Sequence, residues 1–163
     1  MAAVLVAGSI PAGVAAVGAA GPVAGSETAG ALGPAAQETE AVMVAAGRWV
    51  LERMPDGRVC LDPHRSGQGT DEALLERVGQ ALSAELRTLE ETRQCTDVMD
   101  PASCTLDAAA LIAIAHPRID GANATVKVYT WHASDSIREP VSKRTWDLEL
   151  RRGPGGWAVV DGS

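Results

Sequence analysis

Residues 124–131 (ATVKVYTW) and 143–151 (KRTWDLELR) decide the fold, because apolar and polar side chains alternate along both stretches. A period of two is typical of half-buried β-strands, so the two stretches are predicted to pair as an antiparallel hairpin. The predicted register pairs Val126 with Leu150, Val128 with Leu148, Thr130 with Trp146 and Lys127 with Glu149. A shift by one residue would place Val and Leu side chains opposite charged ones, which favours this register.

The flanking segments extend this hairpin into a meander. Residues 153–156 (GPGG) are typical of a turn, after which Trp157 and Val159 return to the apolar face of the hairpin. Residues 111–115 (LIAIA) form a short apolar run that Pro117 closes, which favours a buried strand beside the hairpin.

Two amphipathic helices are predicted before these strands. Apolar residues recur at spacings of three and four over 38–54, and Leu74, Val78, Leu82 and Leu86 recur every four residues over 70–87. Residues 88–96 are predicted as a polar-faced strand. The fold class is therefore α+β, with two N-terminal helices packed on a C-terminal antiparallel β meander and the 70–87 helix covering its apolar face.

The composition changes sharply near residue 36. Residues 1–36 hold 13 Ala, 7 Gly and 3 Pro, with Glu27 as their one charged residue. We interpret them as an Ala/Gly leader and linker, and 37–163 as a single domain long enough to fold without a cofactor or metal. The leader is read as a cleaved signal sequence, which makes the protein exported (periplasmic or secreted). The alternatives are an N-terminal membrane anchor and a flexible leader.

The net charge narrows the range of partners. The chain has 21 acidic residues and 14 Lys and Arg residues, a net charge of −7. Nucleic-acid binding needs clustered positive charge, and anionic lipid surfaces attract polybasic faces. The composition therefore argues against nucleic-acid partners and against docking on anionic lipid.

The end of the sequence resembles a known family. Residues 146–152 (WDLELRR), the Gly-rich turn and residues 157–160 (WAVV) are similar to the closing hairpin of NTF2-like (SnoaL-type) cone domains. The resemblance implies a curved sheet that forms a pocket with helices, used for catalysis by some members and for binding or assembly by others. The enzymes of that family usually place Asp and His in the pocket.

The three cysteines permit several interpretations. Cys95 and Cys104 bracket a short loop whose Asp100–Pro101 turn could bring them together, so an exported protein would form a disulfide there. The alternatives are free thiols, or a metal site in which Cys60 and His64 join the other two cysteines, although that spacing matches no standard zinc motif. Cys60, between Val59 and Leu61, is expected to be a buried small apolar residue.

The histidines are the candidates for acid–base chemistry. His132 could act as a general base oriented by Asp135, and His116 or His132 could work with Asp135 or Asp107 in a closed cavity. The alternative, which the absence of a nearby nucleophile favours, is that the histidines are solvated loop residues.

The face that carries Lys127, Tyr129 and Trp131 is the predicted contact surface, because Tyr and Trp are enriched at interfaces. The alternative is that another segment, such as the 38–54 helix, covers it. The function favoured by the sequence is an exported, non-catalytic domain that binds a small ligand or protein partner through this face or through a sheet–helix pocket. The rival is a small cofactor-free enzyme of SnoaL type, and a homodimer formed through the sheet is compatible with the composition.

Overall fold

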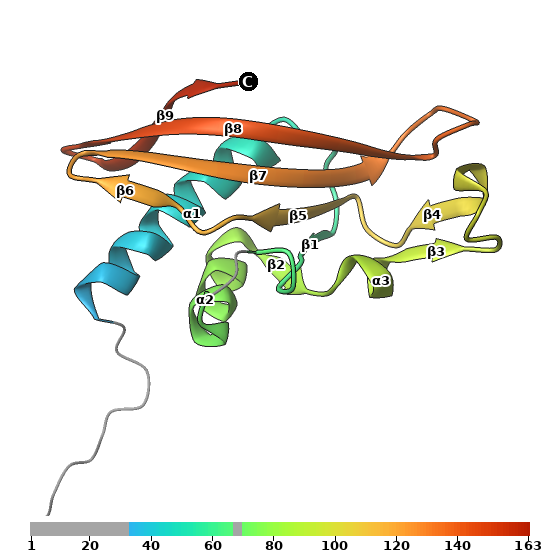
Figure 1. Ribbon diagram of the computed structural model, residues 1–163, viewed down its shortest axis with the longest axis horizontal. Coiled ribbons are helices and arrows are strands. Elements are labelled where there is room, and N and C mark those ends of the chain that lie inside the picture. The colour runs from blue at the N-terminus through green and yellow to red at the C-terminus, as the bar shows by residue number, and fades with distance from the viewer. Residues whose placement is uncertain (1–32, 67–69) are drawn as a thin grey trace, which may run out of the picture.

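The computed structural model describes residues 33–66 and 70–163, which form a mixed α+β domain (Figure 1). These residues contain three helices rather than the two expected, together with one 3₁₀ turn and nine strands. The helical elements are α1 (Pro34–Leu51), α2 (Glu72–Leu82), α3 (Leu89–Thr92) and η1 (Pro101–Ser103). The strands are β1 (Val59–Leu61), β2 (Ala84–Leu86), β3 (Arg93–Cys95), β4 (Cys104–Leu106), β5 (Ala110–Ile114), β6 (Arg118–Asp120), β7 (Asn123–Ala133), β8 (Val141–Gly153) and β9 (Gly156–Gly162).

One large sheet dominates the domain. Its strand order is β2-β1-β5-β7-β8-β9, with β6 paired to β7, while β3 and β4 form a separate small hairpin. The pairs β5–β7, β7–β8 and β8–β9 are antiparallel, as the sequence predicted, and β5 extends the meander as expected. Strand β1 instead runs parallel to both β2 and β5, so α2 is the crossover of a β1–α2–β2 unit.

The register of the β7–β8 hairpin differs from the prediction by two residues. The structure pairs Ala124 with Leu150, Val126 with Leu148, Val128 with Trp146 and Lys127 with Asp147. A shift of two residues leaves every side chain on its predicted face, so alternation along the strands does not detect it. The cross-strand ion pair consequently joins Lys127 to Asp147, at 3.2 Å, in place of the predicted Glu149.

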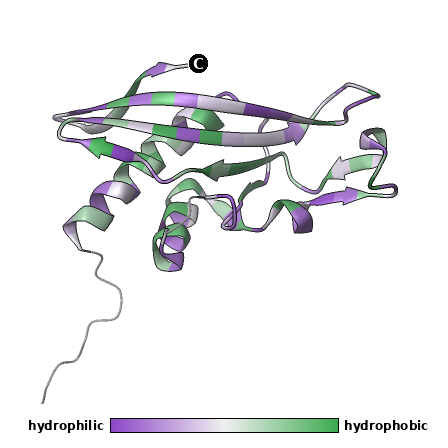
Figure 2. Ribbon diagram, viewed as in Figure 1, coloured by the Kyte–Doolittle hydropathy of each residue, from purple (hydrophilic) through white to green (hydrophobic). Residues whose placement is uncertain are grey.

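The apolar face of the sheet packs against α1 and α2, which confirms the predicted orientation of the strands. Val128 is fully buried and Leu148 is 2% exposed, whereas Lys127 and Glu149 are exposed. Figure 2 shows the corresponding alternation of hydropathy along β7 and β8. Val159 lies opposite Leu150, and Trp157 packs against the same core, as predicted. A second, smaller cluster occupies the other face and contains Cys60, Leu89, Leu111, Ala113 and Trp131.

The second predicted helix is shorter than expected. Asp71, not Thr70, caps α2, with its carboxylate accepting from the Ala73 N–H at 3.2 Å. The helix ends at Ser83, whose φ of 54° is left-handed, a conformation found at helix C-termini. The prediction of helix to residue 87 was therefore wrong, because residues 84–86 leave the helix and pair with β1 as strand β2.

The segment predicted as a strand over residues 88–96 begins with a short helix. Thr88 and Glu91 form a capping box that starts α3, and only Arg93–Cys95 is extended. The backbone N–H of Thr88 holds the pKa of the Glu91 carboxyl below its ordinary value.

The interpretations of residues 1–32 lie outside the described residues, which begin at Gly33. Residues 34–36, which were assigned to the linker, instead form the first turn of α1. Among the helices that are described, none is long and apolar enough to cross a membrane.

Candidate functional site

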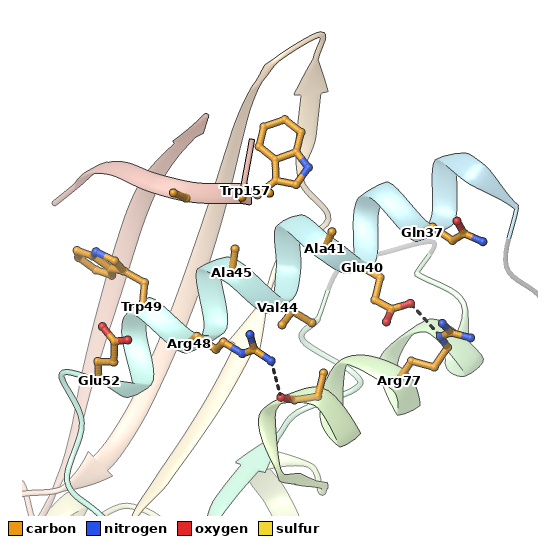
Figure 3. A pocket seen from close by; sticks show the side chains of 14 residues that line it. Gln37, Glu40, Ala41, Val44, Ala45, Arg48, Trp49, Glu52, Arg77 and Trp157 are labelled. Atoms are coloured by element: carbon orange, nitrogen blue, oxygen red, sulfur yellow. Dashed lines mark hydrogen bonds and ion pairs between the residues drawn. The ribbon is translucent and has the colours of Figure 1, made fainter. Parts of the chain in front are cut away.

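An open groove of about 750 Å³ runs along the solvent side of α1 (Figure 3). Helix α1 supplies its floor, α2 borders one side, and the β8–β9 turn with the start of β9 borders the other. The lining residues are Gln37, Glu40, Ala41, Val44, Ala45, Arg48, Trp49 and Glu52 of α1, Arg77 and Ala81 of α2, and Gly155, Gly156, Trp157 and Ala158.

The helical repeat explains why α1 can serve both the core and the groove. Val42, Met43, Ala46 and Val50 are fully buried on the side that faces the sheet. Positions one residue earlier or later rotate by about 100° around the helix and therefore reach another face. The groove side of α1 includes two small side chains, with Ala41 exposed and Ala45 half-buried.

Two tryptophans are the large apolar side chains that line the groove. Trp49 is half-buried, meets Trp146 edge-on at 5.5 Å between ring centroids, and has the Arg53 guanidinium 3.5 Å from its own centroid. Trp157 is also half-buried, and the Arg152 guanidinium lies 5.0 Å from its ring. These contacts hold the rings in place while part of each ring stays accessible from solvent.

The charged groups of the groove tie its helices together. The Arg77 guanidinium of α2 lies 2.8 Å from the Glu40 carboxylate of α1, and Arg48 donates to the Ala81 carbonyl at 3.5 Å. The Arg77 side chain is 44% exposed and that of Glu40 is 21% exposed, so this ion pair is in contact with water. These two contacts join α1 to α2 and fix the shape of the groove. They also place positively and negatively charged groups at its rim.

The face predicted as a contact surface is partly covered. Trp131 is 6% exposed because it packs in the second cluster with Leu89 of α3. Tyr129 is half-buried, and the Lys143 Nζ atom lies 5.7 Å from the ring centroid of Tyr129 and equally far from that of Trp131. Lys127 is exposed and forms the ion pair with Asp147. The cover comes from the α3 region, whereas the alternative interpretation named the 38–54 helix.

The structure does not bring the candidate acid–base residues into one site. His116 is exposed after β5, His132 is half-buried near the end of β7, and Asp135 is exposed in the loop that follows. Asp107 pairs instead with Arg58 at 2.8 Å and Arg87 at 3.2 Å. Hydrogen bonds from these two guanidinium groups hold the pKa of the Asp107 carboxyl below its ordinary value. Across residues 33–66 and 70–163, no hydrogen bond or ion pair joins either histidine to Asp107 or Asp135.

The cysteines follow the favoured interpretation. Cys95 and Cys104 are opposite each other on β3 and β4 and form a disulfide, which is typical of oxidising, exported locations. Cys60 is free and fully buried, and burial raises the pKa of its thiol. The proposed metal set of Cys60, His64, Cys95 and Cys104 is not assembled, and the described part of the chain contains no group of His, Cys, Asp and Glu residues arranged to hold a metal.

Sequence reasoning missed Asp62, a fully buried carboxylate directly after β1. Its Oδ1 accepts from the backbone N–H groups of His64 at 2.9 Å and Arg65 at 3.1 Å, and its Oδ2 accepts from that of Leu89 at 2.9 Å. Ser66 continues the network, because its hydroxyl donates to the Asp62 carbonyl and accepts from the Ile114 N–H. Asp62 therefore anchors the start of α3 to the end of β1. The Asp-Pro pair at 62–63 is a local signal of this turn.

No family model, curated protein or solved structure matches this chain, so the resemblance to NTF2-like domains stays a prediction.

Proposed function

We propose that the protein is a non-catalytic binding domain that contacts a protein partner through the groove on α1. The observation that carries this proposal is the pair of half-buried tryptophans, Trp49 and Trp157, at a groove whose floor includes the small side chains of Ala41 and Ala45. Rigid, partly exposed tryptophans bury large areas on contact at little cost in conformational entropy, which is why they are enriched among binding hot spots.

The shape of the groove favours a macromolecular partner over a small ligand. Sites for small molecules usually enclose most of the ligand surface. This groove is open to solvent along α1, so a small molecule would keep much of its surface in water, whereas a polypeptide could follow the groove. The Glu40–Arg77 pair and Arg48 would meet polar groups of the partner at the rim.

The charged groups argue for binding rather than for the alternative SnoaL-type enzyme. Catalytic acids and bases generally need a site that shields them from water and shifts their pKa values. The groups in the groove contact water or pair with each other, and the candidate histidines lie outside it. The Cys95–Cys104 disulfide supports action in an oxidising, exported location.

Site-specific photocrosslinking in the producing cells tests this proposal. A benzophenone amino acid replaces Ala41, which is exposed in the groove, or Lys127, which is exposed on the face that the sequence favoured. We expect a crosslinked partner of defined mass with the Ala41 position, and loss of this product when Trp157→Ala is added. Crosslinks formed only from Lys127 would refute the groove as the binding surface.

A further inference from the structure

We infer that the groove accepts an extended segment of the partner, which pairs as an additional strand with the free edge of β9. This inference rests on the proposed function and specifies the conformation of what binds. The described residues provide no partner for the outer edge of β9, since the strand order of the sheet ends there. A row of unpaired backbone N–H and C=O groups is satisfied most fully by another extended main chain.

The composition of most of β9 leaves this edge open. Protein edge strands are commonly protected by charged side chains or proline. Residues 156–160 (GWAVV) contain neither, Asp161 is the one charged residue of the strand, and Val160 is 57% exposed. The other edge strands of this sheet, β2 and β6, have three residues each, so β9 is the longest edge that the described residues offer a partner.

The edge lies beside the groove. Gly155, Gly156, Trp157 and Ala158 line the groove together with α1. Neighbouring strands of a sheet are about 4.8 Å apart, so a strand added to β9 would enter the space above the floor of α1. The small side chains of Ala41 and Ala45 leave room for its backbone, while Trp49 and Trp157 can contact its side chains.

A bulge limits where the added strand can pair. The β8–β9 register shifts between Glu149 and Leu150, which leaves Val160 without an opposite residue. Beyond it, the N–H of Gly162 donates to the Asp161 side chain at 2.9 Å. The regular part of β9 therefore runs from Gly156 to Val159, and most of it also lines the groove.

Selection from a phage-displayed library of random 12-residue peptides, using the intact chain, provides the probe. Peptides that bind the wild type and the control variant Glu76→Arg, but not Ala41→Arg, are assigned to the groove. Both positions are exposed, and only Ala41 lines the groove. Each selected peptide is then N-methylated one residue at a time, and its Kd is measured by fluorescence anisotropy.

We expect N-methylation to raise the Kd about tenfold at every second residue over a short central stretch, because alternate N–H groups of an added strand bond to β9. Groove-dependent peptides without this alternation would overturn the strand inference and leave the proposed groove binding intact. Failure to select any groove-dependent peptide would overturn the inference as well. Sedimentation could also overturn the inference. If the chain dimerises and Ala41→Arg makes it monomeric, the occupant of the groove is a second copy of the chain.

Discussion

Replacing Asp62 by Ala should destabilise the domain strongly. Three backbone N–H groups, those of His64, Arg65 and Leu89, would lose a charged acceptor that lies 2.9–3.1 Å away. A hydrogen bond to a charged group contributes about 1.5–3 kcal/mol, and a buried donor left without a partner has a comparable cost. The two N–H groups in the 62–66 turn are partly buried and can regain water, so we expect a total loss of about 3–5 kcal/mol.

Asp71→Ala is the matched control, because Asp71 is also an aspartate that accepts from the backbone, here from Ala73 at an exposed helix start. Loss of such a cap costs about 1 kcal/mol. Asp62→Asn should fall between the two, because an amide keeps one acceptor but turns a donor towards Leu89. Urea unfolding followed by tryptophan fluorescence and circular dichroism measures all three variants. A difference below about 1 kcal/mol between Asp62→Ala and Asp71→Ala would refute the anchoring role of Asp62.

Three further predictions concern packing, thiol chemistry and pH. Gly162→Ala should lower the free energy of unfolding by about 1–3 kcal/mol, because the new Cβ would lie 2.6 Å from the rigid Trp49 ring. Gly153→Ala, which meets no atom closer than 4.0 Å, is the control, and equal effects of the two would contradict the packing. The Cys60 thiol should resist alkylation in the native protein. In urea without reductant the disulfide stays closed and Cys60 alone should react, which adds one label per chain to the intact mass. Labelling of the native protein as fast as in urea would show that the thiol is not buried. The low pKa of Asp107 in the folded state adds stability above its unfolded pKa, about 3.9, and this stability is lost as the pH falls through the folded value. In Asp107→Asn the urea midpoint should therefore fall less steeply as the pH is lowered through the acid range. An unchanged dependence of the midpoint on pH would exclude this contribution.

The faces of the main elements could be predicted from the sequence because they depend on local periodicity. The repeat that marks α1 and α2 places Val42 and Val78 in the core, and alternation places Val128 and Leu148 there. The pairing of β7 with β8 could not be fixed in this way, because registers that differ by two residues bury the same side chains. The loop that joins the strands, residues 134–140, selects between them, and its sequence has no turn signal strong enough to show which.

Other elements depend on contacts between distant residues. Leu86 continues the helical spacing of Leu74, Val78 and Leu82, yet it belongs to β2 because β1 offers it a parallel partner. The Thr88–Glu91 capping box was visible in the sequence and could have identified α3. Asp62 could not be recognised as buried, because one of its partners, the Leu89 N–H, lies 27 residues away.

The groove was predictable only as a general sheet–helix pocket. Its members come from both ends of the described chain, with Trp49 on α1 and Trp157 on β9, and no sequence spacing relates them. The contact surface inferred from Lys127, Tyr129 and Trp131 depended on their sharing one face, which is correct. Alternation along a strand does not show, however, that the α3 region packs over Trp131.

The contact of α1 with β9 has a consequence for how the protein is made. Helix α1 is the first described element to leave the ribosome and β9 the last, and Trp49 packs against Gly162 in the finished domain. The part of α1 that contacts β9, which includes Trp49, therefore stays uncovered in the nascent chain until synthesis of the domain is nearly complete. During that interval α1 is a natural binding site for chaperones. Ribosome profiling of chaperone-bound nascent chains should show engagement beginning after α1 emerges and ending only once β9 has followed.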